Sequence, residues 1–303
     1  MEFGKLHDIT NVDFSLRQEQ PENARVLADA GKRDGSCELY IGCTGWGMKE
    51  WVGTVYPPGA KTKDYLYHYS RQFNTIEFNT THYRIPDADT VARWYAESAP
   101  DFRFCPKIPQ TISHSQDLGH SSGQVLEFTE VIRGLKEKLG CCFIQLPEYF
   151  SPDRWRLLDG FLERFSPEVP LAVEFRHPGW FFPKGESVLF PLLEAHGAAA
   201  VITDVAGRRD VAHMRLSAPR TMIRFVGNGL DPSDFSRIGQ WVERFKIWEA
   251  QGLREIIFFA HEPDNLLAPE LSVYLLDKVQ ERIPARVRGP RLLNKGKQMD
   301  LFE

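Results

Sequence analysis

Residues 142–175 read CFIQLPEYFSPDRWRLLDGFLERFSPEVPLAVEF, and the pattern of this stretch decides the fold. Two short apolar runs, Cys142–Leu146 and Leu171–Phe175, flank a segment in which large apolar residues recur every three or four positions. That spacing is typical of one face of a helix, whereas the flanking runs have the length of strands. Strand, helix and strand in this order predict a parallel β-α-β unit.

The same alternation continues along most of the chain, and amphipathic segments lie in most of the gaps between the predicted strands. The predicted strands are Leu39–Cys43, Thr75–Asn79, Phe102–Lys107, Cys142–Leu146, Leu171–Phe175, Ala199–Asp204, Thr221–Val226 and Glu255–Ala260. Eight such units predict a single-domain α/β fold, a (β/α)8 barrel of the TIM type. The interval 205–220 is too short and broken to predict a helix. An open doubly wound sheet is therefore the alternative, although no glycine-rich phosphate loop follows an early strand.

Two segments of different composition flank the predicted barrel domain, residues 38–281. Residues 1–37 are a polar leader without the apolar core of a signal peptide, and residues 282–303 are basic and predict a flexible tail. No apolar run approaches the roughly 20 residues that a membrane-spanning helix needs. The formal net charge of -4 does not indicate a strongly basic nucleic-acid-binding protein. Because the five cysteines form no CxxC pair, we expect reduced thiols and a cytoplasmic location.

Polar residues gather at the carboxyl ends of the predicted strands, where barrel enzymes place their functional groups. A charge there is costly to bury unless it is paired or binds a ligand. Side-chain alternation puts Glu77 with Asn79, and Glu174 with Arg176, on shared faces of their strands. The predicted catalytic residues are Glu77, Lys107, Glu174, Arg176, His177 and Asp204, and the predicted binding residues are Trp46, Asn79, Tyr83, Gln145 and Arg224.

Several interpretations of this polar set stay open. It could be a structural ion-pair network that closes the barrel top. Alternatively, Lys107, Arg176 and Arg224 hold the negative charge of a phosphate while a carboxylate acts as general acid or base. A divalent metal is a further hypothesis, with candidate ligands Glu174, His177, Asp204 and His261, although no HxH or HExxH spacing supports it. Trp46 and Tyr83 could stack on a base or sugar, or pack the barrel mouth.

Several sequence blocks resemble the YecE-like family, also called domain of unknown function 72. The resemblance runs from about Tyr40 to Val279 and implies a TIM-type barrel without an established reaction. The family tends to carry an asparagine-rich stretch after the last strand, where this chain has residues 260–265, AHEPDN. The matching blocks are residues 41–46 (IGCTGW), 73–84 (FNTIEFNTTHYR), 104–109 (FCPKIP), 145–147 (QLP) and 173–180 (VEFRHPGW).

The end of the chain carries a second resemblance. Gln298, Leu301 and Phe302, within the sequence QMDLF, resemble the short motif by which bacterial repair and replication proteins dock on the sliding clamp. A disordered tail can place a Leu-Phe pair in an apolar pocket, although the same pair could fold back on the barrel. The sequence therefore favours an enzyme that binds or processes nucleic acid or a phosphorylated ligand. The alternatives are a metabolic, metal-assisted enzyme on a small sugar or phosphate, and a noncatalytic adaptor.

Overall fold

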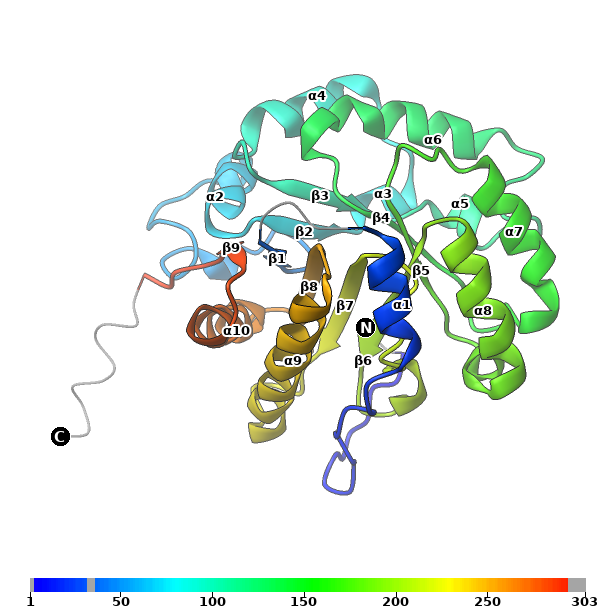
Figure 1. Ribbon diagram of the computed structural model, residues 1–303. Coiled ribbons are helices and arrows are strands. Elements are labelled where there is room, and N and C mark those ends of the chain that lie inside the picture. Colours follow the sequence, from blue (N-terminus) through cyan, green and yellow to red (C-terminus); the bar gives the residue numbers. More distant parts are fainter. Residues whose placement is uncertain (1–2, 32–35, 294–303) are drawn as a thin grey trace.

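The computed structural model describes residues 3–31 and 36–293 and has an α/β fold, with strands at the centre and helices outside them (Figure 1). The eight predicted strands are all present, within two residues of the predicted bounds, and every pair of neighbouring strands is parallel. The strands are β1 (Glu38–Gly42), β2 (Thr75–Phe78), β3 (Arg103–Pro106), β4 (Cys142–Gln145), β5 (Leu171–Glu174), β6 (Ala199–Asp204), β7 (Arg220–Val226), β8 (Glu255–His261) and β9 (Arg286–Arg288).

Backbone ladders divide these strands into a seven-stranded sheet, in the order β4-β5-β6-β7-β8-β1-β9, and the pair β2-β3. The expected closed barrel is therefore not formed by continuous ladders in the part of the chain that the structure describes. Single contacts cross one gap, from β3 to β4, where Lys107 pairs with Phe143 and the Ile108 amide donates to the Phe143 carbonyl over 2.8 Å.

The other gap, from β1 to β2, is bridged by the Asn74 side chain and by a backbone hydrogen bond of 3.0 Å from the Glu77 amide to the Cys43 carbonyl. Asn74 accepts from the Ile41 amide at 2.7 Å and donates to the Leu39 carbonyl at 2.9 Å, so its amide group replaces a ladder partner. Gly42 permits the close approach of the two strands, since a Cβ atom there would lie 2.3 Å from the Thr75 carbonyl oxygen. These contacts connect the pair β2-β3 to β1 on one side and to β4 on the other, although the ladders are interrupted there.

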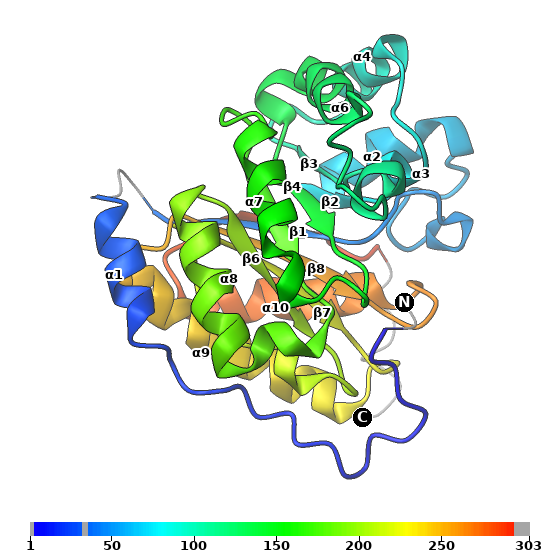
Figure 2. The ribbon, with the colours of Figure 1, turned by 90° about the vertical axis from the view of Figure 1, so that its right-hand side faces the viewer.

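Helices cover the outside of the strands (Figures 1 and 2). The α-helices are α1 (Glu22–Asp29), α2 (Tyr65–Gln72), α3 (Thr80–Tyr83), α4 (Ala88–Glu97), α5 (Gln110–Ser113), α6 (Gln124–Ile132), α7 (Trp155–Arg164), α8 (Pro183–Ala195), α9 (Pro232–Gln251) and α10 (Ala268–Arg282). Short 3-10 helices are Lys49–Trp51, Thr62–Asp64, Arg133–Lys138, Pro152–Arg154, Pro178–Phe181 and Arg209–Val211. Helix α9 ends at Gln251, and the next residue, Gly252, has a φ of +108°, which glycine adopts readily.

The connection from β6 to β7 contains only the 3-10 helix Arg209–Val211, and a helix of the leader covers this position instead. Asn23 of α1 is fully buried. Its side chain donates to the Met214 carbonyl at 2.9 Å and accepts from the Leu216 amide at 2.8 Å. The polar leader is thus an integral part of the fold, and α1 occupies the place of the missing crossover helix.

The predicted flexible tail begins too early. Residues 286–288 form β9, which pairs with β1 in parallel, from Glu38 opposite Arg286 to Tyr40 opposite Arg288. Arg288 also donates two hydrogen bonds of 2.8 Å to Asp101 and one of 3.0 Å to the Phe73 carbonyl. At least one of the basic residues of this segment, Arg288, is therefore used in contacts within the fold.

Two apolar layers separate the strands from the helices, and a third cluster fills the space that the strands enclose. The enclosed cluster contains Phe143, Ala172, Val201, Met222 and Phe259. Alternation along each strand then directs the residue two positions later to the same side, at the carboxyl end. Within residues 3–31 and 36–293, no helix combines the length and the apolar character that crossing a membrane requires.

Candidate functional site

A layer of polar side chains lies directly above the enclosed apolar cluster, at the carboxyl ends of the strands. Each member lies two residues after an inward-facing position, so the alternation that buries the apolar cluster also brings these groups together. The layer consists of Glu77 of β2, Lys107 after β3, Gln145 of β4, Glu174 of β5, Thr203 of β6, Arg224 of β7 and His261 of β8, all of them buried.

Arg224 is the centre of this layer and is only 2% exposed. Its Nε and Nη2 atoms donate to the two carboxylate oxygens of Glu77, at 2.9 and 2.8 Å. Its Nη1 atom donates to both oxygens of Glu174, at 2.9 and 2.7 Å. One guanidinium therefore holds two carboxylates, and planar bidentate pairing is the geometry for which arginine is suited.

Further donors complete both carboxylates. Glu77 accepts from Asn79 Nδ2 at 2.9 Å and lies 2.8 Å from His261 Nε2. Glu174 also accepts from Gln145 Nε2 at 2.7 Å and from Arg176 Nε and Thr203 Oγ1, both at 3.4 Å. The structure thus brings these predicted residues together. Their pairing is also the ion-pair network that the structural interpretation of the polar set describes.

Lys107 has spare hydrogen-bonding capacity. Its Nζ atom donates to Gln145 Oε1 at 3.0 Å, which is one of the three bonds that an ammonium group can donate. Lys107, Arg176 and Arg224 carry positive charge, while Glu77 and Glu174 carry the negative charge of the layer. Lys107 and Arg224 balance the two carboxylates within the layer, and Arg176, which borders the layer and donates to Glu174, adds one positive charge in excess when Lys107 is protonated.

The pKa values follow from burial and from these charges. Burial by itself would raise the pKa of Glu174, but Arg224 and Arg176 overcome it and lower that pKa to about 2. The pKa of Glu77 is likewise held well below its ordinary value, against its burial, by Arg224 and His261. Burial and the nearby Arg224 charge lower the pKa of Lys107 to about 8. Both carboxylates are therefore ionised at neutral pH, and Lys107 titrates just above it.

Two predicted catalytic residues lie elsewhere. Asp204 points away from the polar layer and pairs with Arg237 of α9 at 3.1 Å, while Trp241 Nε1 donates to it at 2.8 Å. His177 accepts from the Gly179 amide at 3.0 Å and so caps the 3-10 helix that follows β5. Both side chains satisfy local structural needs.

The metal and stacking hypotheses are also corrected in part. The side chain of Asp204 is paired with Arg237 and that of His177 accepts from the Gly179 amide, so neither is arranged as a metal ligand with Glu174 and His261. No group of three or more His, Cys, Asp or Glu side chains arranged to hold a metal occurs among the described residues. The ring of Trp46 stacks on Phe78, with 5.1 Å between ring centroids, which is a packing role. Tyr83 is 71% exposed and stays available at the rim.

A cavity of about 220 Å³ lies beside the polar layer, at the ends of β6, β7 and β8. His261 and Glu262 line it, and leader residues 4–7 and 9 form part of its wall. Burial raises the pKa of Glu262 to about 7, although the Gly229 amide donates to its Oε2 atom at 2.8 Å. Glu262 is not among the predicted catalytic residues, although its position, a carboxylate directly after β8, could have indicated it.

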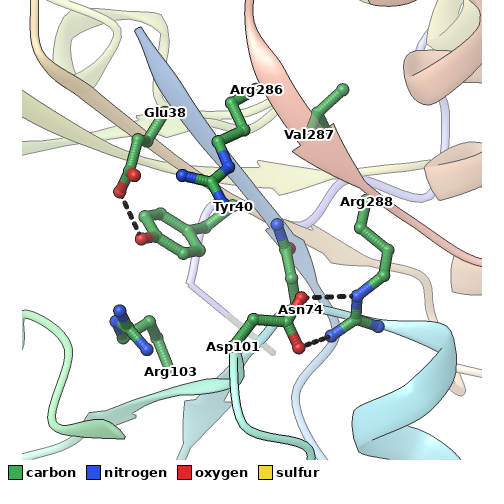
Figure 3. A pocket seen from close by; sticks show the side chains of 8 residues that line it. All are labelled: Glu38, Tyr40, Asn74, Asp101, Arg103, Arg286, Val287 and Arg288. Atoms are coloured by element: carbon green, nitrogen blue, oxygen red, sulfur yellow. Dashed lines mark hydrogen bonds and ion pairs between the residues drawn. The ribbon is translucent and has the colours of Figure 1, made fainter. Parts of the chain in front are cut away.

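A second cavity, of about 210 Å³, lies at the opposite, amino-terminal end of the strands (Figure 3). There Tyr40 donates to Glu38 at 2.6 Å, and Arg288 forms its two bonds with Asp101. Residues at this end of a parallel barrel usually serve stability. The ion pair of Arg288 fits that role because it fastens β9 to the loop before β3.

Comparisons with known proteins agree with this architecture. A family model described as "Protein of unknown function DUF72" matches residues 40–293. The UPF0759 protein YecE of Escherichia coli K12 is 33% identical over 266 residues, which cover 81% of this chain and 94% of YecE. The UPF0759 protein YunF of Bacillus subtilis 168 is 25% identical over 207 residues, 62% of this chain and 70% of YunF.

Solved structures support the fold alone. The crystal structure of a DUF72 family protein from Enterococcus faecalis V583 matches with a TM-score of 0.65 and 19% identity, covering 80% of this chain and 95% of that one. The DUF72 family protein from Thermotoga maritima MSB8 matches with a TM-score of 0.62 and 21% identity, covering 80% and 98%.

Proposed function

The chain belongs to the DUF72 family of proteins of unknown function, and from this premise we propose that it binds a phosphorylated compound at the carboxyl ends of its strands and carries out acid–base chemistry on it. The proposal includes a TIM-type barrel whose ladders are interrupted at two places. The eight successive parallel strands and the bridging contacts across both gaps support that description.

The observation that carries the proposal is the excess of positive charge where Arg176 borders the polar layer, together with the unused donors of Lys107. A purely structural network gains most when its charges are matched and its donors are used, because burying an unpaired charge is costly. Here Lys107 is 8% exposed and makes one hydrogen bond, and Arg176 supplies the positive charge in excess. A phosphate group carries the negative charge and the acceptor oxygens that this arrangement lacks.

Two groups have pKa values suited to proton transfer near neutral pH. Lys107 titrates at about 8 and Glu262 at about 7, so each is present in both protonation states near pH 7.5. His261 connects the two regions, because its Nε2 atom contacts Glu77 and the residue is among those that line the cavity with Glu262. An isomerase-like reaction, in which a proton is removed and returned, fits such a pair best.

Ligand-dependent stabilisation tests the proposal. Thermal unfolding and calorimetry with inorganic phosphate, pyrophosphate and ribose 5-phosphate should reveal at least one stabilising compound, with ribose as the uncharged control. Lys107→Met should weaken that binding at least about tenfold, the equivalent of 1.4 kcal/mol. Lys184→Met removes the same charge from an exposed position and should leave binding unchanged.

The pH dependence gives an independent measurement. Since Lys107 loses its proton around pH 8, affinity for the phosphorylated compound should fall between pH 7 and pH 9. Failure of every phosphorylated compound to bind, or equal binding by Lys107→Met, would refute the proposal.

We also keep a role in DNA metabolism as a second proposal, supported by the clamp-like sequence at Gln298, Leu301 and Phe302. These three residues lie outside the part of the chain that the structure describes. Binding of the full chain to the sliding clamp, compared with a Leu301→Ala, Phe302→Ala variant, tests this proposal, and equal binding by both would end it. A cytoplasmic location belongs with it and is consistent with five buried, free cysteines.

A further inference from the structure

The leader crosses the carboxyl ends of the strands before it reaches α1. The Gly207 amide, just after β6, donates to the Gly4 carbonyl at 2.8 Å. Farther on, Gln240 of α9 accepts from the Leu16 amide at 3.0 Å, and the segment before α1 runs along that helix (Figure 2). The first described residues of the chain therefore lie at the mouth of the candidate site.

Phe3 anchors this segment. Its side chain is 7% exposed and belongs to the same apolar cluster as Val205 and Val226, at the ends of β6 and β7. The guanidinium carbon of Arg176 lies 4.5 Å from the centroid of the Phe3 ring, and that of Arg208 lies 4.9 Å from it. An aromatic ring therefore occupies a seat formed by two guanidinium groups and apolar strand ends. We call this arrangement the Phe3 seat.

The Phe3 seat is continuous with the polar layer. Arg176, which contacts the ring, also donates from Nε to Glu174 at 3.4 Å. Arg208 is held in place by Asp210, through contacts of 2.8 and 2.6 Å, and donates to the Arg176 carbonyl at 2.8 Å. A ligand whose phosphate binds at the polar layer would therefore have the Phe3 seat next to it.

Phe3 and the two arginines that contact it lie in different parts of the chain with respect to the family match. The family model covers residues 40–293, which include Arg176 and Arg208, whereas Phe3 lies in the leader outside the matched region. Arg176 and Arg208 thus lie in the part of the chain that the family model matches, and the aromatic ring that they contact comes from outside it. Guanidinium groups attract the face of an aromatic ring, and this attraction is used widely to hold nucleic-acid bases.

We propose that the Phe3 seat is a subsite for the planar aromatic ring of a phosphorylated ligand, such as a nucleoside phosphate, and that Phe3 occupies it until this ligand displaces the segment. The inference rests on the proposed function, because it takes the phosphate to bind at Lys107. It adds that the ligand is aromatic and that the leader competes with it.

Calorimetric titration of the full-length chain tests the proposal with two probes. Adenosine 5′-monophosphate carries both a ring and a phosphate, while ribose 5-phosphate carries the phosphate alone. If the Phe3 seat is free in about one molecule in ten, Phe3→Ala should tighten binding of the nucleotide about tenfold. Binding of ribose 5-phosphate should change less than about twofold.

Arg208→Gln provides a second variant that leaves Phe3 in place. It removes one guanidinium from the Phe3 seat and should weaken nucleotide binding while ribose 5-phosphate binds as before. Hydrogen exchange gives a readout without mutation, because the amides of residues 4–9 should exchange faster when the nucleotide, but not ribose 5-phosphate, is bound. Thermal unfolding verifies that both variants are folded.

The outcomes separate the two proposals. Ring-dependent tightening in Phe3→Ala supports the Phe3 seat as a subsite. Equal nucleotide affinity in the wild-type chain and in a folded Phe3→Ala variant, with ribose 5-phosphate still bound, overturns the subsite and leaves the phosphate site standing. If neither probe nor inorganic phosphate binds any form of the chain, both proposals fail.

Discussion

Replacement of Arg224 by methionine should be the most damaging single change in the polar layer. The substitution keeps an unbranched side chain but leaves Glu77 and Glu174 buried without the guanidinium that contacts both. Breaking one buried ion pair typically costs about 3–5 kcal/mol. Two carboxylates lose their partner here, but Arg176 and His261 remain beside them, so we expect a loss of about 5 kcal/mol in the free energy of unfolding at pH 7.

The pH dependence of stability should also change sign. In the wild-type chain the pKa of Glu174 is lowered to about 2, so its contribution to stability is complete above the ordinary value of 4.5 and is lost as the pH falls through about 2. Without Arg224, burial raises the pKa of both carboxyl groups above their unfolded values. Arg224→Met should therefore be relatively more stable at pH 5 than at pH 7.

Urea unfolding followed by circular dichroism at pH 5 and pH 7 measures both effects. The triple variant Glu77→Gln, Glu174→Gln, Arg224→Met is the matched control, since it removes the charges together and should recover most of the lost stability. A loss below about 1 kcal/mol in Arg224→Met, with the same value at both pH values, would refute the assignment of this arginine as the centre of the layer.

Three further predictions concern residues outside that centre. Asn74→Ala should cost about 2–4 kcal/mol in urea unfolding, since it leaves the Ile41 amide and the Leu39 carbonyl without their partner. Asn74→Asp keeps the acceptor but buries a carboxylate beside the Leu39 carbonyl, and should cost at least as much at pH 7. Glu262→Gln should raise stability by about 1 kcal/mol at pH 8 and hardly at pH 5. The raised pKa of Glu262 makes its contribution complete below pH 4.5 and lost as the pH rises through about 7. Asn23→Ala should lower the unfolding midpoint and increase proteolysis of the leader, because Asn23 fastens α1; unchanged proteolysis would contradict this role.

The strands could be predicted because each is a short apolar run bounded by polar loops, and this signal does not depend on distant contacts. The interruptions of the sheet, and the contacts that bridge them, could not be predicted. Asn74 bridges β1 and β2 only because Gly42 lets the strands approach, and β9 joins the sheet through partners such as Asp101 that lie far away in sequence. A basic, proline-containing segment is equally compatible with a free tail or with a strand held by arginine pairs.

The packing of the leader against the strands could not be predicted, for a related reason. Its polar composition describes its solvent face, whereas its docking depends on two buried groups, Phe3 and Asn23. Single residues of this kind leave no periodic signal. The gap between β6 and β7, too short for a helix, was the indirect indication that another segment had to cover those strands.

The contrast between Glu174 and Asp204 shows where alternation can and cannot locate a site. Both are carboxylates at the last position of a parallel strand, and both are fully ion-paired. On β5, the pair Glu174 and Arg176 marks one face as polar, so the direction of Glu174 could be inferred. On β6, both faces are apolar until the final two residues, and nothing indicates that Thr203 points inward and Asp204 outward. In a parallel strand that is covered on both faces, the sequence does not show which side chains point inward. The register with the neighbouring strand determines the direction of these side chains. Arg224 points inward, so its register partner Thr203 must point inward too, and Asp204 must point outward toward α9. Asp204 is therefore excluded from proton transfer at the proposed phosphate site.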